Sequence, residues 1–585
     1  MIRNTRQFVE ILRKENELLE ITTEVDPYLE LAEIQRQVVA QKGPAVLFKN
    51  VKGTRFPVVT NLYGSEKRID LALGKKPENF IRDAVDLAQR FFPPDFKKIW
   101  EAKKFFLPFL KIGRKRVSHF PNSASLSLKD LPQIQCWPED GGAFVTLPLV
   151  YTQSPTSQKS NLGMYRIQLY DEKHCGMHIQ IHRGGGFHFH EAEALGQNLP
   201  VHIYVGGPPA LTIAAILPLP EDVPEILFAS LLMGERLKYA NRPEISPLPI
   251  LADADFCIVG EIIAGKRRPE GPFGDHYGYY SLQHDYPYVE VKHVLSREDA
   301  IYPATVVGRP PQEDHYIACY LQELLKPLIQ AVMPQVKTIW AYEESGVHSL
   351  ATAVVKDRYP REALTTALRI LGEGQLSLSK VLMVTDRDCD VKNFKTFFPI
   401  LLERMNFATD LFVLSNISQD TLDYTGPKVN EGSKAVFLGV GEAKRVLPKD
   451  FNSAELGRPF SEALVFCPGA LAVTGPAYVA NDGFAKILAK NPALKDWPMV
   501  FLFDDAEAAV KTPEDFIWHA FTRFEPAADI HAHATEPNRY HFCLTPPIVI
   551  DCRMKPWYPK VLESDPKVAR RAAESPCLST LFARK

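Results

Sequence analysis

Apolar residues recur at helical spacing near the start of this chain. One such pattern covers residues 5–20 and a second covers 27–41, where Asp26 is placed to cap the helix. Residues 45–48 have the pattern of a strand, and a further helix is expected at about 84–91. These elements predict an opening region of α/β type.

Between about residues 145 and 307 the pattern changes to short runs of β-branched and aromatic residues bounded by glycine and proline. Strands at such short intervals are typical of a sheet or barrel rich in antiparallel pairs. Beyond Gly308 helical and strand patterns alternate again, as at 361–371 and 380–385, which predicts a second α/β region. No internal repeat is evident. The clearest runs of the middle region are Arg166–Leu169, Val201–Val205, Phe256–Ile263 and Tyr288–Leu295.

Length and composition narrow the class of protein. A chain of 585 residues is too long for one ordinary core, so two to three domains are expected. The formal net charge of -2 gives no overall attraction to nucleic acid. The nine cysteines are scattered without C-x-x-C spacing, which argues against a zinc ribbon and a disulfide framework. Since no apolar run of about 18 residues occurs either, we expect a cytoplasmic protein that does not span a membrane.

Six of the 16 histidines fall between residues 174 and 202, beside three consecutive glycines. Such clustering points to a metal, although each histidine by itself is more commonly a sheet-face or surface residue. His188 and His190 would share one face if this segment is a strand. Asn161 lies upstream and an acidic stretch, 218–225, lies downstream. An asparagine oxygen, an imidazole and a carboxylate would form a mostly hard ligand set that suits Mn²⁺ or Mg²⁺.

Glu270 and Asp275 lie five residues apart in a stretch rich in glycine and proline. They could meet around a common point, where an arginine would keep one acid ionised and burial would raise the pKa of the other into a proton donor's range. The alternative is a surface turn in which Arg267 and Arg268 balance the two acids. No Walker A, G-x-S-x-G, H-E-x-x-H or complete dinucleotide motif is present.

Four stretches occur in a distinctive order: N-L-G-M-Y-R at 161–166, I-H-R-G-G-G at 181–186, P-E-G-P-F-G-D-H-x-G-Y-Y at 269–280 and V-G-R-P-P at 307–311. Together they resemble the UbiD family of prenylated-FMN-dependent decarboxylases. The resemblance implies an α/β (α+β) protein with an N-terminal α/β segment, a central split β-barrel that binds flavin, and a C-terminal α/β oligomerisation domain. The implied domains are residues 1–120, 121–325 and 326–585.

The resemblance also implies roles for single residues. Arg166, Glu270 and Asp275 would form the catalytic trio, with Asp275 at the position of the proton donor. The implied ligands of a Mn²⁺-type ion that holds the cofactor phosphate are Asn161, His182 and Glu225. The residues expected to line the cofactor are Met164, Tyr165, Arg166, His178, Ile179, Gln180, Arg183 and Gly184.

The implied activity is the non-oxidative, reversible decarboxylation of an aromatic acid. Loss of CO₂ from an sp² carbon leaves an anion that no side chain can accept, so a cofactor must supply the electron sink. The implied cofactors are prenylated FMN and Mn²⁺, with K⁺ as a further candidate. The implied partners are the substrate, a flavin prenyltransferase that supplies the cofactor, and further copies of the chain in a homodimer or homohexamer.

Several alternatives stay open. The substrate could be a hydroxybenzoate of ubiquinone synthesis or a dihydroxynaphthoate of menaquinone synthesis, since the chain is nearer in length to relatives of the second pathway. An FMN-dependent oxidoreductase on the same barrel would need a dinucleotide site, and none is visible. A non-catalytic, metal-binding assembly protein would use the acids structurally.

A basic and aromatic stretch covers residues 96–116, with eight Lys or Arg against a single acid, Glu101. This composition suits reversible contact with the inner face of an anionic membrane. A solvated basic face over buried aromatic residues is the alternative.

Overall fold

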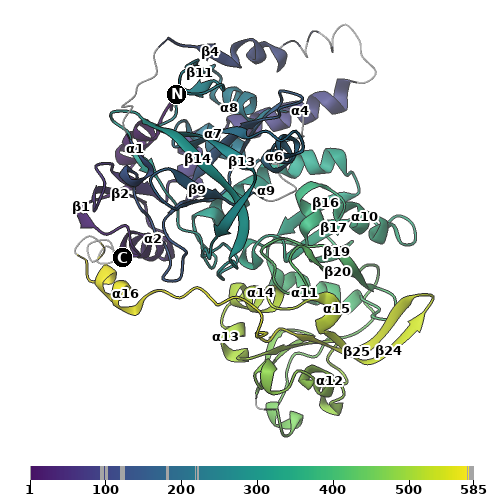
Figure 1. Ribbon diagram of the computed structural model, residues 1–585. Helices are drawn as coiled ribbons and strands as arrows, with labels where there is room; N and C mark the ends of the chain where they lie inside the picture. Colours follow the sequence, from purple (N-terminus) through teal and green to yellow (C-terminus); the bar gives the residue numbers. More distant parts are fainter. Residues whose placement is uncertain are drawn as a thin grey trace. The chain divides into compact units, whose positions relative to one another are not determined.

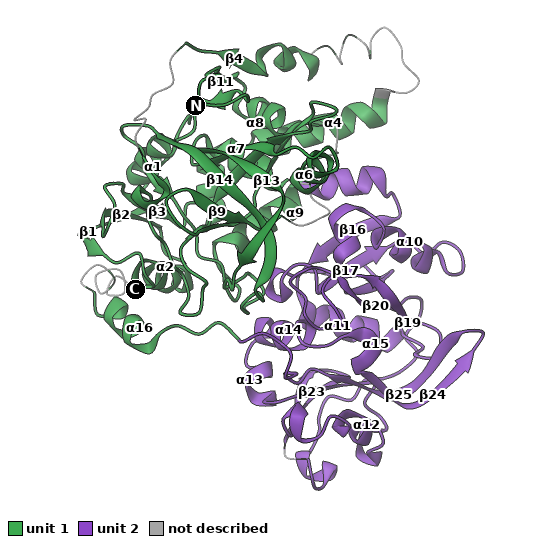
Figure 2. Ribbon diagram, viewed as in Figure 1, with its two compact units in different colours: residues 1–324, 561–585 green, residues 325–560 purple. Residues whose placement is uncertain are grey.

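The computed structural model of the chain contains two compact units (Figure 2). Unit 1 comprises residues 1–324 and 561–585, and unit 2 comprises residues 325–560. Unit 1 is therefore built from both ends of the chain. No helix among the residues described is long and apolar enough to cross a bilayer. The structure describes residues 2–91, 98, 100, 103, 105–118, 126–179, 184–217, 219, 223–460, 462–575 and 578.

Unit 1 begins with helices around a four-stranded sheet in the order β1-β2-β3-β15. The pattern over residues 5–20 divides into α1 (Thr5–Lys14) and the start of β1 (Leu18–Val25), which pairs in parallel with β2 (Ala45–Val51). The predicted second helix is α2 (Glu30–Ala40), but Asp26 does not cap it. The Asp26 carboxylate instead accepts a hydrogen bond from the Tyr28 N–H. The remaining early elements are β3 (Val58–Thr60), α3 (Glu66–Leu73) and α4 (Lys76–Phe91).

The centre of unit 1 is an eight-stranded sheet in the order β5-β8-β9-β14-β13-β10-β6-β7. Every neighbouring pair is antiparallel, as the short β-branched runs predicted. The two longest strands, β13 (Phe256–Glu270) and β14 (His284–Ser296), form a hairpin whose connection carries Asp275 (Figure 1). The other strands are β5 (Phe144–Val145), β6 (Pro148–Gln153), β7 (Ser160–Gly163), β8 (Ile167–Leu169), β9 (His174–Met177) and β10 (Leu199–Val205).

Helices and short strands complete unit 1. Among them, α2 and the last helix, α16 (Pro566–Ala573), lie side by side although more than five hundred residues separate them in the sequence (Figure 2). The others are α6 (Gly184–Ala194), α7 (Pro209–Ile216), α8 (Glu225–Met233), β4 (Arg114–Arg116), β11 (Leu237–Ala240), β12 (Ile250–Leu251), β15 (Tyr302–Pro303) and α9 (Glu313–Val332), which runs past the end of unit 1.

Unit 2 contains two five-stranded sheets with one topology. Their orders are β16-β17-β18-β20-β19 and β21-β22-β23-β25-β24. In each sheet the first pair is antiparallel, the next two pairs are parallel and the last is antiparallel. The sequence shows no internal repeat, but the topology of the two sheets repeats. The strands are β16 (Val336–Ala341), β17 (Leu350–Val355), β18 (Val381–Thr385), β19 (Leu411–Ser418), β20 (Glu431–Gly439), β21 (Glu462–Cys467), β22 (Ala470–Thr474), β23 (Met499–Phe503), β24 (Ile530–Asn538) and β25 (His541–Asp551).

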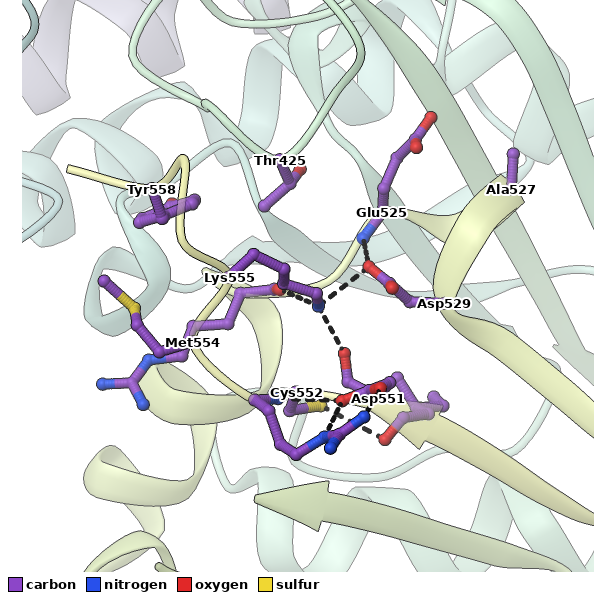
Figure 3. Close-up of polar contacts among 12 residues, drawn as sticks. Thr425, Glu525, Ala527, Asp529, Asp551, Cys552, Met554, Lys555 and Tyr558 are labelled. Atoms are coloured by element: carbon purple, nitrogen blue, oxygen red, sulfur yellow. Dashed lines mark hydrogen bonds and ion pairs between the residues drawn. The ribbon is translucent and has the colours of Figure 1, made fainter. Parts of the chain in front are cut away.

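Each of the two repeats also has an ion pair at the equivalent position. Lys444 Nζ lies 3.4 Å from Asp410 Oδ2 in the first repeat, and Lys555 Nζ lies 3.0 Å from Asp529 Oδ2 in the second (Figure 3). In both repeats the same carboxylate oxygen accepts the main-chain N–H of the residue four positions earlier, at 2.8 Å and 2.7 Å. Unit 2 therefore consists of two copies of one fold, β16–β20 and β21–β25.

Candidate active site

Arg166 immediately precedes β8 and binds both predicted acids. Its Nε and Nη2 donate to the two carboxylate oxygens of Glu270, each at 2.8 Å, and its Nη1 donates to Asp275. The Glu270 side chain is fully buried, and that of Arg166 is 9% exposed. A bidentate arginine pair in such a site is well oriented. The trio predicted from the sequence is therefore brought together.

Residues 270–281, the last residue of β13 and most of its connection to β14, are called the acid turn below. Asp275 N–H donates to the Tyr279 carbonyl at 3.0 Å, and Gly278 N–H donates back to the Asp275 carbonyl at 2.9 Å. Gly271 adopts a φ of +89°, a conformation that a residue with a Cβ rarely adopts. The turn is thus closed by its own main chain and holds Asp275 toward Arg166.

The surface-turn alternative does not describe these acids. Arg267 pairs with Glu193 at 2.8 Å, and Arg268 lies 3.9 Å from Asp171. Neither arginine therefore balances the acid turn, and Arg166 supplies that charge instead.

The electrostatics differ from the expectation of one raised pKa. Burial alone would raise the pKa of Glu270, but the Arg166 guanidinium outweighs it and lowers the pKa to about 2. Burial likewise opposes ionisation of Asp275, yet the hydrogen bond from His276 and the charge of Arg166 hold its pKa below the usual range. His276 Nδ1 lies 2.8 Å from Asp275 Oδ1. Both acids are ionised in this arrangement, so the expectation of a raised pKa is wrong here.

Two of the three predicted metal ligands lie near one another. Glu225 begins α8, and its Oε2 accepts the N–H of Leu162, the residue after Asn161, at 2.9 Å. Burial raises the pKa of Glu225, and no ion pair to its carboxylate occurs in the described part of the chain. The third predicted ligand, His182, lies outside the described residues, as do Gln180 and Arg183. Within the described ranges no group of three His, Cys, Asp or Glu could hold a metal.

The remaining predicted cofactor residues surround the same region. A Cβ on Gly184 would fall 2.2 Å from Asn161 Oδ1, so the main chain passes directly against that oxygen. Tyr165 OH accepts the Gly185 N–H at 3.3 Å. His178 Nδ1 lies 3.3 Å from Glu270 Oε2, while its buried Nε2 has no hydrogen-bond partner among the described residues. Ile179 is buried and Met164 is partly exposed. An unsatisfied imidazole nitrogen beside the trio is consistent with a polar cofactor.

The histidine-rich segment is partly helical and does not form the strand on which His188 and His190 would share one face. Residues 184–194 form α6, so His188 and His190 do not share a face. His188 Nδ1 lies 2.9 Å from Thr152 Oγ1, and burial lowers its pKa. His188 is therefore a structural contact between α6 and the sheet.

Sequence reasoning missed the groups that hold the acid turn. Gln168, two residues after Arg166 and on the same face of β8, accepts the Gly271 N–H at 2.8 Å. Asp140 accepts the Gly274 N–H at 2.7 Å. Ser281 Oγ accepts from Arg166 at 2.9 Å. Only the position of Gln168, on the face of Arg166, could have been inferred from the sequence.

Comparison with known families gives three matches in chain order. The family described as "3-octaprenyl-4-hydroxybenzoate carboxy-lyase", UbiD, matches with its N-terminal domain over residues 9–88, its Rift-related domain over 113–310 and its C-terminal domain over 315–439. The second repeat and the C-terminal segment lie beyond these matches.

Individual proteins agree with the family matches. A Chlamydia pneumoniae protein, named as a subunit of a 4-hydroxybenzoate decarboxylase, is 46% identical over 577 residues, 97% of both sequences. The vanillic acid decarboxylase of Sedimentibacter hydroxybenzoicus in closed form has a TM-score of 0.66 at 23% identity, covering 78% of this chain and 97% of its own. An evolved dimeric form of the UbiD-class enzyme HmfF from Pelotomaculum thermopropionicum, in complex with prFMN, has a TM-score of 0.61 at 20% identity, with coverages of 77% and 97%. The structural matches show a shared fold.

Proposed function

The chain belongs to the UbiD family of carboxy-lyases, and on that premise we propose that it removes CO₂ from an aromatic carboxylic acid without net oxidation. The observation that carries the proposal is the buried contact of Arg166 with Glu270 and Asp275. Two buried acids share one guanidinium in this site, and both acids have strongly shifted pKa values. Perturbed, buried groups of this kind are typical of catalytic sites.

We propose prenylated FMN as the cofactor, held through Mn²⁺ by Asn161, His182 and Glu225, with K⁺ as a further candidate. The half-buried Glu225 carboxylate and the close approach of Gly184 to Asn161 fit a cation at this place. The unpaired Nε2 of His178 fits a polar ligand beside the trio. When bound, the prenylated flavin supplies the sink for the electron pair that departing CO₂ leaves behind.

The residues of the trio would bind and orient the substrate and would deliver a proton to it. Asp275 stays ionised while Arg166 and His276 contact it. If Arg166 shifts toward the carboxylate of a bound substrate, the pKa of Asp275 rises, because a stabilising positive charge is withdrawn. Asp275 can then take up one proton from solvent and deliver it to the carbon that has lost CO₂, while Glu270 remains paired with Arg166.

The substrate is proposed to be a quinone-precursor acid, either a hydroxybenzoate or a dihydroxynaphthoate. The name of the Chlamydia pneumoniae relative supports the hydroxybenzoate class. In this proposal a flavin prenyltransferase supplies the cofactor, and the chain assembles as a homodimer or homohexamer.

The test is co-expression with a flavin prenyltransferase, followed by the absorption spectrum and CO₂ release from benzoate, naphthoate and cinnamate acids. We expect a bound prenylated flavin and CO₂ release from at least one hydroxylated aromatic acid. Oxidation of NADH or NADPH by an FMN-loaded protein that releases no CO₂ would support the oxidoreductase instead. Protein that binds neither flavin nor metal would support the assembly alternative.

We also propose a peripheral membrane contact through the basic and aromatic stretch. Several of its apolar side chains are largely exposed, among them Trp100 at 68%, Phe106 at 53%, Leu107 at 49% and Leu110 at 72%. Exposed apolar side chains among cations suit the surface of an anionic bilayer. Sedimentation with anionic liposomes at low and high salt tests this contact, and binding that is absent at low salt would exclude it.

A further inference from the structure

The acid turn is covered on its outer side by the end of the chain. Residues 561–575, called the C-terminal strap below, follow the second repeat and return to unit 1. Val561 forms an antiparallel bridge with Tyr279, and Leu562 N–H donates to the Gly278 carbonyl at 3.0 Å. Both contacts fall on the turn whose main chain fixes Asp275. The strap is therefore joined to the acid turn by one isolated bridge and one main-chain hydrogen bond.

The strap is anchored immediately after this contact. In α16, Ala572 is 1% exposed and belongs to the main hydrophobic core of unit 1, together with Leu562. Gln37 of α2 donates to the Ala569 carbonyl at 2.9 Å, and Arg571 lies 3.0 Å from Glu30. The Leu562 contact is thus followed by a helix that packs against α2 and is anchored in the core through Ala572.

A second line of contacts leads from α2 back to the acid turn. The Arg36 guanidinium of α2 lies 4.0 Å from the ring centroid of Trp137. A Cβ on Gly274 would fall 2.1 Å from that indole, so Trp137 packs directly on the main chain next to Asp275. The neighbouring Asp140 accepts the Gly274 N–H. The acid turn is therefore supported from two sides, and α2 links both supports.

We propose that the C-terminal strap is a positioning element of the active site, which holds the acid turn so that Asp275 faces Arg166. The strap lies outside the segments that match the UbiD family, which end at residue 439. Its role in catalysis rests on the proposed function. Its effect on the acid turn does not, and can be measured in the protein without any substrate.

The test compares two identical substitutions at neighbouring positions of α16. Ala572→Asp places a carboxylate in the core and displaces α16, whereas Ala573→Asp places it on the exposed face. Trypsin cleavage after Arg570 and Arg571 reports whether α16 has been released. Hydrogen exchange of the peptide that covers residues 271–281 reports the order of the acid turn.

With α16 released, we expect exchange in the acid turn to accelerate by about tenfold or more, because its outer hydrogen bonds then open locally. In the loaded enzyme kcat should fall by about tenfold to a hundredfold with little change in KM, since small misplacements of a reacting group are costly. Ala573→Asp should match the parent in both measurements. If Ala572→Asp does not fold, Leu562→Pro removes the N–H that bonds to Gly278 and carries the same expectations.

The pH profile separates positioning from plain stability. Asp275 faces Arg166 and His276, with Glu270 and His178 on the far side of the guanidinium. Asp275 is the proposed proton donor, and a loosened turn weakens the contacts that keep it ionised. The pKa of Asp275 should therefore rise, and the alkaline limb of kcat should move to higher pH in Ala572→Asp. Released α16 with parental exchange in the acid turn would overturn the proposal. No activity in any variant or in the parent would instead count against the proposed function, and exchange would still decide the role of the strap.

Discussion

At the residue scale, one guanidinium sets the state of the whole site. Arg166 pairs with two buried carboxylates, and its guanidinium lies 4.7 Å from the centroid of the Phe273 ring. A buried charge without a partner costs several kcal/mol, so each of the three groups depends on the other two. A substitution at Arg166, Glu270 or Asp275 should therefore affect catalysis more than folding, provided that it keeps the charge balance of the site.

Asp275→Asn keeps the size of the side chain and removes its transferable proton. We expect turnover to fall on the order of 10² or more, the usual weight of general acid catalysis, with cofactor and metal content near the parental level. Asp285→Asn, an exposed acid of the same hairpin, is the control and should leave turnover unchanged. Near-parental decarboxylation by fully loaded Asp275→Asn would transfer the donor role to another group.

Glu225→Gln removes the charge that is proposed to hold the metal but keeps the hydrogen-bonding oxygen for Leu162 N–H. We expect loss of both the metal and the prenylated flavin, measured by elemental analysis and absorbance, because the cofactor phosphate then lacks its cation. The exposed Glu244 provides the control, Glu244→Gln, with unchanged content. Equal loading in both variants would contradict the ligand role.

The pH dependence of folding follows from Glu270. Because its pKa is lowered to about 2, it contributes stability above its ordinary pKa of 4.5, and this contribution is lost as pH falls from about 4.5 toward 2. Asp275 acts in the same direction. The double variant Glu270→Gln, Asp275→Asn should be less stable than the parent at neutral pH. It should also lose less stability than the parent as pH falls across that window. Denaturant titrations at several pH values measure how steeply the free energy of unfolding falls with pH.

At the element scale, the two repeats of unit 2 place one ion pair in two environments. Lys444 is 43% exposed beside Asp410, whereas Lys555 is 4% exposed beside Asp529. Figure 3 shows Lys555 directed at Asp529 next to the Asp551 segment. Lys555 also donates to the carbonyls of Arg523 and Asp551, both at 2.7 Å. The ion pair should therefore contribute differently to the free energy of unfolding in the two repeats.

Lys555→Ala should destabilise unit 2 by about 3–5 kcal/mol, because it leaves Asp529 buried without its cation. Lys444→Ala, the matched substitution in the first repeat, should cost at most about 1 kcal/mol, because Lys444 is exposed and Asp410 keeps its ion pair with Arg361. Chemical denaturation followed by a probe in unit 2 compares them. Equal costs would show that burial does not distinguish the two pairs.

At the scale of the whole molecule, each unit has its own hydrophobic core, so unfolding should not follow one two-state transition. Unit 1 contains the proposed cofactor and metal residues. Ligands that bind only the folded form of one unit stabilise that unit by mass action. The heat-unfolding profile is therefore predicted to resolve into two components that respond to different perturbations.

In differential scanning calorimetry, Mn²⁺ with prenylated FMN should raise only the transition of unit 1. Lys555→Ala should lower only the transition of unit 2, which identifies the two components independently. A single transition that moves as a whole under both perturbations would contradict the prediction and indicate that the units unfold together.

The sequence by itself determined much of this protein, because the relevant signals are local. Alternating apolar runs predicted the antiparallel strands, and the ordered motifs around Arg166, Glu270 and Asp275 indicated the family and the trio. Hydrophobic period and turn chemistry act over a few residues and can therefore be read in one dimension. The first helix was expected to continue to about Glu20 and so included the start of β1, where a short apolar run fits either helix or strand.

Only the tertiary structure decided the rest. Asp140 and the C-terminal strap reach the acid turn from segments far apart in the chain, and no local pattern marks such contacts. The repeat in unit 2 was invisible because a sheet topology constrains apolar positions but not residue identity. The lowered pKa values of Glu270 and Asp275 depend on how closely Arg166 approaches them, and packing fixes that distance.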